Sequence, residues 1–565
     1  MMIENLTEAF WAVFELKTIL LMIVGTAAGL IAGAIPGFTI AMAVILTLPF
    51  TFTMPPVQGL AMMIAVFVGG LSGGLMSGML AGIPGTPSSI ATTFDGFPLV
   101  RSGKPGLALG IGVWSSFCGG LISAVALVLL APQLAILGLE FGPWDYFALV
   151  FFALTITASL AGENFLKGMI AGALGLLVRT IGEDDINGVA RFSFGIEPLE
   201  QGFAFLPVLI GLFAFSQLLS DVKDPKRAKE ALMSDTGSGV VKVEHRAALK
   251  VIMIGWPNLL RSSLIGIFVG ILPAAGGSIS NILAYDQAKK ASKTPELFGT
   301  GTPEGIIAPE AANNATAGGA LIIMMALGIP GDLVAAVMLG ALLIHDVVPS
   351  PTFISENTVI AYGIFIAFFI AHFMMIGLQA VCLRLFLMVT RVPMYTLTAV
   401  ILAYCAIGVF ALHNVGFDLW TLFIFGILGY AMRLLGFPLA PMILGVVLGN
   451  LAELNLSRAY ASSNEWTTFV FSFFTRPWSL FFLLLAVFSL GFPWFQKDRG
   501  KKKWALVYIP IMCLALAIPL FLMGGIVRPT IGAILILISL NMLRKRAQEG
   551  WHIEDKKDLI SELRE

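Results

Sequence analysis

The longest uncharged stretch of the chain limits its fold more than any other feature. Between Lys17 and Asp95, 77 consecutive residues carry no Asp, Glu, Lys or Arg. About 20 apolar residues suffice to span a bilayer as a helix, so several spans must lie in this stretch. Of the whole chain, 58% of residues are hydrophobic and only 12% are charged, against roughly 25% charged in a typical soluble domain. The sequence therefore predicts an all-α polytopic membrane protein and excludes an ordinary globular enzyme.

The ionisable and metal-ligating residues exclude further classes of function. The net charge is zero, so the chain as a whole has no electrostatic attraction to nucleic acid. The four cysteines stand singly inside apolar runs, without the clustered spacing of a disulfide framework or a zinc site. The sequence has no His-Glu-x-x-His motif and no Walker loop. We therefore expect neither a metal site nor a cofactor, and no ATP-driven pump within this polypeptide.

The tetrapeptide Gly-Ile-Pro-Gly occurs twice, at Gly82–Gly85 and at Gly328–Gly331. Each copy has an upstream partner of the form Gly-x-x-x-Gly-x-x-Pro, made by Gly29, Gly33 and Pro36 in the first half and by Gly266, Gly270 and Pro273 in the second. The partners are 237 residues apart (29 to 266) and the tetrapeptides 246 (82 to 328), so the order is kept and the spacing nearly so. This pattern predicts an internal duplication, with one membrane repeat over residues 18–220 and a second over residues 251–496.

Each of these motifs predicts a broken or re-entrant helix, because proline lacks a backbone donor and interrupts the helix ladder. The residues assigned to the breaks are Pro36, Gly37, Gly82, Pro84, Pro273, Gly328 and Pro330. The loop over residues 51–58 contains no cation, whereas the corresponding loop of the second half carries Lys289, Lys290 and Lys293. By the positive-inside rule, the two repeats are expected to be inverted relative to each other in the membrane.

Three segments lie outside the predicted repeats. Residues 1–17 combine aromatic and acidic side chains, which suits either a helix at the membrane interface or a solvated lead-in but not the start of a secretory signal. Residues 221–250 hold seven Lys or Arg and five Asp or Glu, and are expected to form a hydrophilic cytoplasmic linker. Residues 497–565 are expected to form a transmembrane hairpin and a cytoplasmic tail, because Lys501–Lys503 and Arg544–Arg546 flank the hairpin.

Longer motifs surround the breaks in both halves. The first half reads Gly-Ile-Pro-Gly-Thr-Pro-Ser-Ser-Ile-Ala-Thr-Thr-Phe-Asp-Gly-Phe-Pro at 82–98 and Arg-Phe-Ser-Phe-Gly at 191–195. The second reads Phe-Gly-Thr-Gly at 298–301, Ala-Pro-Glu-Ala-Ala-Asn-Asn-Ala at 308–315, Gly-Gly-Ala-Leu at 318–321 and Leu-Gly-Ile-Pro-Gly at 327–331. In these motifs the chain closely resembles the large membrane subunit, or permease, of the bacterial tripartite tricarboxylate transporter family.

The resemblance implies a multi-pass secondary transporter of the bacterial inner membrane that imports a di- or tricarboxylate-like anion by cation symport. It implies two protein partners, a periplasmic solute-binding protein and a small membrane subunit, and no nucleic acid. The implied coupling cation is sodium or a proton. Many members of the family have Glu-Ala where this chain has Thr86-Pro87, and few have a hairpin after Lys497.

Transporters built from repeats bind substrate near the midplane, where broken helices leave backbone N–H groups and carbonyls unpaired. Substrate contacts are expected from residues beside the two tetrapeptides, namely Gly85, Thr86, Ser88, Ser89, Asn313, Asn314 and Gly331. Thr92 and Asn314 are the expected ligands of the cation. Each residue also has a structural alternative. A serine can cap its own helix, and the asparagines can bond one helix to another, since burying an unpaired amide costs ~2–7 kcal/mol.

Two carboxylates lie close to these residues in sequence. Glu310 is expected either to cap the following helix or to lie in a solvated loop. Asp95 is followed by Gly96, Phe97 and Pro98, which is typical of a turn with an Asx-type bond, with ion coordination as the alternative.

Two other classes of protein compete with a transporter. A passive anion channel can also contain paired broken helices, so the composition leaves it open. An intramembrane aspartyl protease needs Tyr-Asp and Gly-x-Gly-Asp motifs inside the membrane. Tyr285-Asp286 lies beside lysines, and Ile329 stands where the second motif requires glycine, so this alternative is disfavoured.

Overall fold

The computed structural model describes residues 2–35, 38–51, 53–160, 165–184, 188–221, 242–389, 394–463 and 465–548, together with Trp551. The break residues Pro36 and Gly37, most of the expected linker and the end of the expected tail lie outside these residues. The described chain is almost entirely helical, and ten of its helices are long and apolar enough to cross a membrane. The prediction of an all-α polytopic membrane protein is confirmed.

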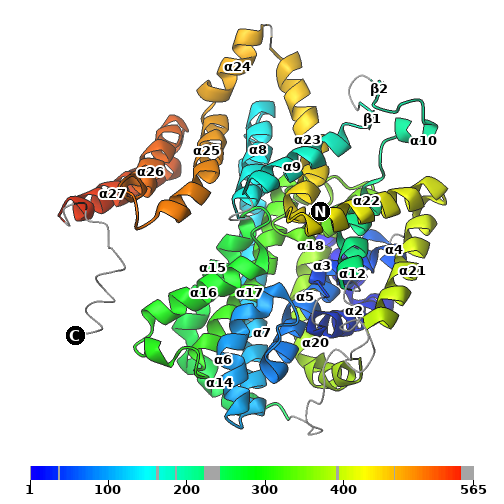
Figure 1. Cartoon of the computed structure of the whole chain (residues 1–565), viewed down its shortest axis with the longest axis vertical. Coiled ribbons are helices and arrows are strands. Elements are labelled where there is room, and N and C mark those ends of the chain that lie inside the picture. Colours follow the sequence, from blue (N-terminus) through cyan, green and yellow to red (C-terminus); the bar gives the residue numbers. More distant parts are fainter. Residues whose placement is uncertain are drawn as a thin grey trace. The chain divides into compact units, whose positions relative to one another are not determined.

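The helices group into two compact units (Figure 1). The first comprises Met1–Glu140 and Phe203–Leu435, and the second comprises Phe141–Gly202 and Gly436–Glu565. Elements from both expected repeats therefore belong to the first unit, and no unit boundary falls in the expected linker. The division into repeats stays a prediction.

The first unit contains two series of helical elements, one from each expected repeat. The first series is α1 (Met2–Phe14), α2 (Leu16–Ala34), α3 (Ile40–Ile45), α4 (Leu48–Thr51), α5 (Pro56–Ala81), the 3-10 turn η1 (Pro87–Ser89), α6 (Ile90–Arg101) and α7 (Pro105–Gly138). The second is α14 (His245–Ile254), α15 (Trp256–Ile271), α16 (Gly276–Ala291), η4 (Pro295–Leu297), α17 (Glu304–Leu327), α18 (Leu333–Ile344), α19 (Phe353–Glu356) and α20 (Thr358–Val389). The unit is completed by α11 (Phe205–Ile210), the π-helical turn η3 (Gly211–Phe215), α12 (Ser216–Asp221), α21 (Met394–His413) and α22 (Gly416–Leu434).

The two Gly-Ile-Pro-Gly segments end their helices in the same way. Gly82 follows α5 with φ 73° and donates its N–H to the Gly78 carbonyl at 3.1 Å. Gly328 follows α17 with φ 71° and donates to the Met324 carbonyl at 3.0 Å. A positive φ is the conformation that glycine adopts without a Cβ penalty, so glycine at these positions ends the helix.

The helix upstream of each break also packs in the same way in both series. A Cβ at Gly29 would come within 2.2 Å of the Val66 carbonyl oxygen, and a Cβ at Gly266 within 2.3 Å of the Ala312 carbonyl oxygen. Val66 and Ala312 are 246 residues apart, the spacing of the two tetrapeptides. In each half, the glycine therefore lets two helix backbones approach at equivalent positions, α2 with α5 and α15 with α17.

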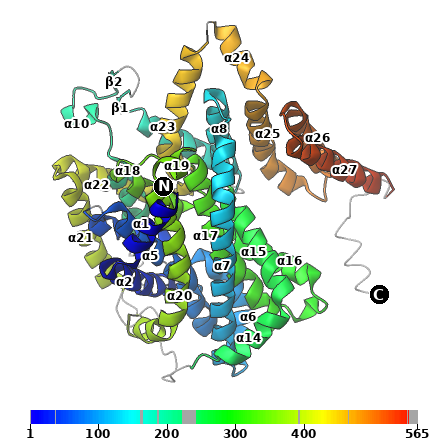
Figure 2. The ribbon, with the colours of Figure 1, turned by 180° about the vertical axis from the view of Figure 1, so that it is seen from behind.

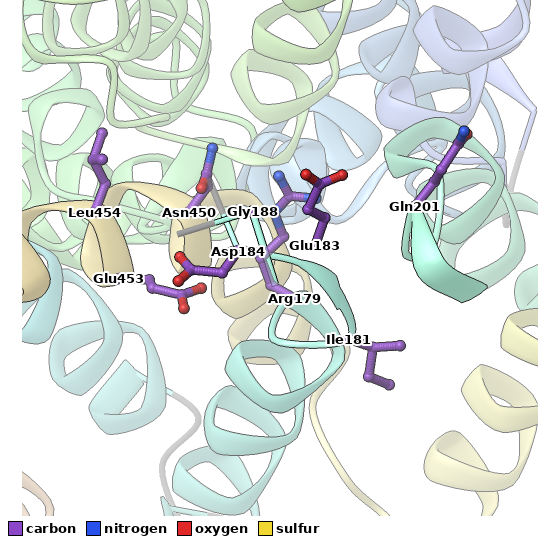
Figure 3. A pocket seen from close by; sticks show the side chains of 9 residues that line it. All are labelled: Arg179, Ile181, Glu183, Asp184, Gly188, Gln201, Asn450, Glu453 and Leu454. Carbon is purple, nitrogen blue, oxygen red and sulfur yellow. The ribbon is translucent and has the colours of Figure 1, made fainter. Parts of the chain in front are cut away.

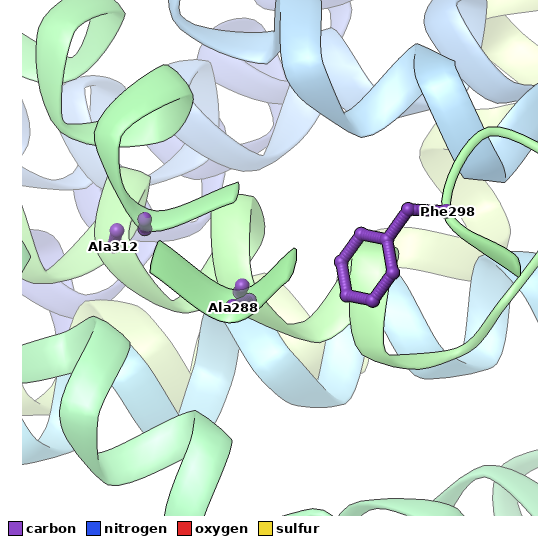
Figure 4. Packing of buried hydrophobic residues seen from close by; sticks show 5 residues of the cluster. Ala288, Phe298 and Ala312 are labelled. Atoms are coloured by element: carbon purple, nitrogen blue, oxygen red, sulfur yellow. The ribbon is translucent and has the colours of Figure 1, made fainter. Parts of the chain in front are cut away.

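Two helices form the core of the first unit. Almost every residue of α5 and of α17 is buried. α17 packs against α7, α15 and α16, while α5 packs against α2 and α20 (Figure 2). The contact between α16 and α17 is made by small residues that include Ala288 and Ala312, with the ring of Phe298 closing one end of the cluster (Figure 4).

The second unit contains α8 (Pro143–Leu160), α9 (Phe165–Arg179), α10 (Glu197–Glu200), α23 (Leu439–Ala461), α24 (Trp466–Thr475), α25 (Pro477–Asp498), α26 (Trp504–Leu522) and α27 (Val527–Gln548). Strands β1 (Gly182–Glu183) and β2 (Ala190–Arg191) form a two-residue antiparallel ladder. α8 packs on α25 and α9 on α23, while α26 and α27 pack together as the hairpin expected from the sequence.

Candidate functional site

The hydroxyl-rich segment after Gly85 is a buried 3-10 turn that leads into α6. Thr86, Ser88 and Ser89 are all buried. The Ser89 hydroxyl donates to the Thr86 carbonyl at 2.9 Å and accepts from the Thr86 N–H at 3.4 Å. The Thr86 and Ser88 hydroxyl oxygens are 3.1 Å apart. These local bonds are those of a capping box. The alternative that a serine caps its own helix is therefore observed at this turn.

Ser88 of the first half meets Asn313 of the second half at the start of α16. A Cβ at Gly277, in the first turn of α16, would lie 2.5 Å from Asn313 Oδ1 and 2.9 Å from the Ser88 Cβ. Only glycine leaves room for the two side chains at this point. Asn313 Nδ2 donates to the Leu71 carbonyl at 3.1 Å, while its buried Oδ1 has no hydrogen-bond partner among the described residues.

Asn314 makes bonds that join helices. Its Oδ1 accepts from the Ser72 hydroxyl of α5 at 3.1 Å, and its Nδ2 donates to the Glu310 carbonyl of its own helix at 3.3 Å. The structure therefore brings Ser88 and Asn313 together but directs Asn314 towards α5.

Glu310 is the central residue of a buried polar network. It lies inside α17 with no exposed surface, so the expectation of a helix cap or a solvated loop is wrong. Its Oε1 accepts from the Thr92 hydroxyl of α6 at 2.6 Å, and its Oε2 from the Ser116 hydroxyl of α7 at 2.7 Å. α17 already begins at Glu304 and contains Pro309, so no helix starts at this proline for Glu310 to cap.

Asn281 of α16 extends this network to the start of α6. Its Oδ1 accepts from the Ala91 N–H at 2.7 Å, and its Nδ2 donates to the Thr92 hydroxyl at 3.3 Å. An amide from the second half thus caps a helix of the first half. Sequence reasoning missed Asn281 and Ser116, which no motif marks. Glu310 had a signal, since residues three and four positions apart share a helix face and Asn313 and Asn314 follow it at that spacing.

The network contains one carboxylate and no basic group. Within the described chain, Glu310 forms no ion pair, and no group of three or more His, Cys, Asp or Glu side chains could hold a metal ion. Two hydroxyl donors only partly compensate a buried carboxylate. Glu310 is therefore suited to carry a proton or to bind a monovalent cation.

Asp95 lies within α6, so the expected turn at this residue is wrong. Its Oδ1 accepts three backbone N–H groups, from Gly299, Gly301 and Thr302, at 2.8–2.9 Å. Its Oδ2 accepts from the Tyr285 hydroxyl at 2.8 Å. A concave row of N–H groups is a typical carboxylate site. These long-range bonds keep α6 helical through Pro98 and fasten it to the loop before α17.

The two glycines that close the tetrapeptides lie where backbones touch. A Cβ at Gly85 would come within 2.3 Å of the Gly33 carbonyl oxygen, and a Cβ at Gly331 within 2.1 Å of the Gly270 carbonyl oxygen. Gly33 and Gly270 are themselves equivalent by the repeat spacing. The two breaks are therefore anchored against the preceding broken helix in both halves.

The comparisons with known proteins agree with this architecture. Residues 19–444 match the family described as the tripartite tricarboxylate transporter TctA family. The chain belongs to this family. This TctA family member is thus the membrane component of a transporter and not an enzyme, as the sequence motifs had indicated.

Two relatives of this TctA family member come from Agrobacterium vitis. One, an "uncharacterized 52.8 kDa protein in TAR-I ttuC' 3'region", is 32% identical over 458 residues, which is 81% of this chain and 90% of the relative. The other, an "uncharacterized protein in TAR-II ttuC' 3'region", is 34% identical over 206 residues, which is 36% of this chain and 85% of the relative. No solved structure gives a significant match.

Proposed function

We propose that the protein is a secondary active transporter that imports a di- or tricarboxylate-like anion together with a cation across the bacterial inner membrane. A periplasmic solute-binding protein delivers the substrate, and a small membrane subunit completes the complex. The family supports the coarser statement, a membrane component of a tripartite tricarboxylate transporter. The finer steps rest on the side chains beside the two broken elements.

The substrate carboxylate binds where Ser88 and Asn313 meet the start of α16. The N-terminus of this 16-residue helix offers backbone N–H groups and a partial positive charge. Thr86 and Ser89 flank the site, while Gly85 and Gly331 bring the chain backbone beside it. The observation that carries the assignment is Asn313 Oδ1, a buried acceptor without a partner in the described chain. A substrate hydroxyl, a protonated carboxyl or the coupled cation would complete it.

The cation binds at Glu310, beside Thr92 and Asn314. An ionised Glu310 repels an anionic substrate, and a sodium ion or a proton on Glu310 removes that repulsion. Binding of the cation and of the anion therefore favour each other, as thermodynamic linkage requires of a symporter. Residues 18–94 and 311–331 contain no Lys or Arg, so the cation supplies charge compensation that these segments lack.

Uptake by the full-length protein in proteoliposomes, with its small subunit and binding protein, tests the proposal. We expect a radiolabelled tricarboxylate to accumulate above equilibrium only with an inward sodium or proton gradient. Glu310→Gln should retain substrate exchange and lose gradient-driven accumulation by about tenfold or more. Glu304→Gln, on the same helix and partly exposed, is the matched control. Flux that never exceeds equilibrium in the parent would indicate a passive channel, and accumulation by Glu310→Gln at the parental level would exclude Glu310 as the cation site.

A further inference from the structure

A polar cavity of about 400 Å³ lies in the second unit, and none of the residues of the site described above lines it. It is lined by the end of α9, the β1–β2 hairpin and the middle of α23, through Arg179, Ile181, Glu183, Asp184, Gly188, Gln201, Asn450, Glu453 and Leu454. Figure 3 shows Asp184 and Glu453 near Arg179, with Glu183 beside them. The Arg191 side chain pairs with Glu453 and ties the hairpin to α23.

The cavity lies at the end of the second unit that is opposite its lysine cluster. Asp145, at the start of α8, pairs with Arg476, next to the start of α25, at 2.9 Å, so α8 and α25 begin at the same end. α9 returns towards that end, because Gly168 near its start packs on Ala158 near the end of α8. α25 instead ends beside Lys501–Lys503. By the positive-inside rule, the lysines face the cytoplasm and the cavity faces the other side.

The surface around the cavity is acidic. Three carboxylates, those of Glu183, Asp184 and Glu453, line it together with the Arg179 guanidinium, and Arg191 pairs with Glu453, so the carboxylates outnumber the guanidiniums by one. Further along the chain, Glu197 and Glu200 are exposed on α10, which packs on β1. A surface with this excess of carboxylates repels an anionic substrate and an anionic lipid headgroup. It favours a lysine or arginine side chain of a protein.

Two phenylalanines after β2 are held outward by an unfavourable backbone. Phe192 is 54% exposed and Phe194 81% exposed. Their φ angles are 53° and 51°, in the left-handed region that bulky side chains rarely adopt. Backbone strain clusters at functional sites, and here it coincides with large apolar side chains in contact with solvent. Exposed aromatic anchors beside charged pockets are typical of protein-protein contacts.

We propose that this surface, formed by Phe192, Phe194 and the acidic cavity, is the docking site of the solute-binding protein. The inference rests on the proposed function, because it names the place where one partner of that function binds. A basic side chain of the binding protein enters the cavity beside Glu183, and an apolar patch covers Phe194. The side of the membrane, the charge of the cavity and the exposed rings each favour this partner over lipid or substrate.

The test measures the affinity of the solute-binding protein of the same tripartite system for the full-length transporter in nanodiscs. Phe194→Ser should raise Kd by about tenfold or more, as truncation of a central anchor does. Glu183→Gln should raise Kd by a smaller factor and flatten its dependence on salt, since an interfacial charge pair is screened. The matched controls are Phe471→Ser on α24 and Glu465→Gln, which alter exposed residues of the same unit.

Each outcome bears on the proposal. Unchanged Kd for Phe194→Ser and Glu183→Gln would overturn the docking site, as would an equal loss in the two controls. A drop in the thermal stability of Phe194→Ser in nanodiscs, with unchanged Kd, would show that the ring anchors the chain in the membrane instead. If the parent itself does not bind the solute-binding protein, the proposed function fails, and not merely the location of the docking site.

Discussion

α5 and α17 are both followed by a Gly-Ile-Pro-Gly break in the first unit, yet only α17 carries a buried carboxylate, that of Glu310. Both are buried along nearly their whole length, and both end at a left-handed glycine. Subtracting 246 from the numbers of Glu310, Asn313 and Asn314 gives Ile64, Phe67 and Val68. The packing is thus repeated and the polar groups are not. These side chains of the candidate site therefore lie on one of two helices whose backbone contacts are alike.

The segments after the two breaks also differ, but here the first half carries more of the polar side chains. The first break leads into the hydroxyls of Thr86, Ser88 and Ser89, whereas the second leads into Asp332 and an apolar helix start. Asp332 Oδ1 accepts from the Ala335 N–H at 2.7 Å and serves as an ordinary N-cap. Each half therefore supplies what the other lacks, hydroxyls from the first and an amide and a carboxylate from the second. A site with both sets of groups requires both halves.

The largest expected effect concerns the orientation of the halves. Thr53 is exposed in the loop between α4 and α5, and Lys290 is exposed in the last turn of α16, where the sequence had led us to expect a loop. If the halves are inverted, a membrane-impermeant maleimide should label Thr53→Cys only from outside intact cells and Lys290→Cys only after permeabilisation. The parent chain, whose Cys382, Cys405 and Cys513 are buried and Cys118 partly so, gives the background. Labelling of both sites from the same side would refute the inverted arrangement.

The next effect tests whether the packing is equally strict in both halves. Gly85→Ala and Gly331→Ala each force a Cβ against a backbone carbonyl, which side-chain movement cannot relieve. We expect each to lower the free energy of unfolding by more than ~3 kcal/mol, beyond ordinary overpacking. Gly377→Ala on α20 meets nothing within 4 Å and should be neutral or stabilising by up to ~1 kcal/mol. Thermal unfolding in detergent measures all three, and tolerance of Ala at only one of the two breaks would show that the scaffold is not equivalent.

A smaller effect separates the two aspartates of the short helices. Asp95→Ala removes the shared acceptor of three backbone N–H groups and a tyrosine hydroxyl in partly buried surroundings, so we expect a loss of about 3 kcal/mol in stability. Asp332→Ala removes one N-cap bond and should cost about 1 kcal/mol. Equal losses of thermal stability in the two variants would mean that the bonds between α6 and the loop before α17 contribute little.

The sequence predicted the fold class because hydrophobicity and helix breakers are local signals. The uncharged stretch and the two tetrapeptides were enough to indicate the spans and the cap residues Gly82 and Gly328. The pairing of Ser88 with Asn313 followed from the expectation that the breaks face each other. The buried position of Glu310 could not be predicted from the neighbouring residues. Pro309 favours a helix start at this point, and tertiary packing overrides that preference. Asn281 and Ser116 gain their roles through contacts 189 or more residues away.

The most direct test of a site shared by the two halves is the affinity of the full-length protein in nanodiscs for its substrate. A panel of di- and tricarboxylates, titrated by calorimetry with and without sodium and at two pH values, identifies the best ligand of the parent. We expect Ser88→Ala and Asn313→Ala each to weaken its binding by about tenfold or more, which corresponds to ~1.4 kcal/mol. Ser263→Ala, whose hydroxyl bonds only to the Leu259 carbonyl of its own helix, should bind like the parent. Parental affinity in both site variants would contradict the shared site, and loss in only one of them would place the substrate in a single half.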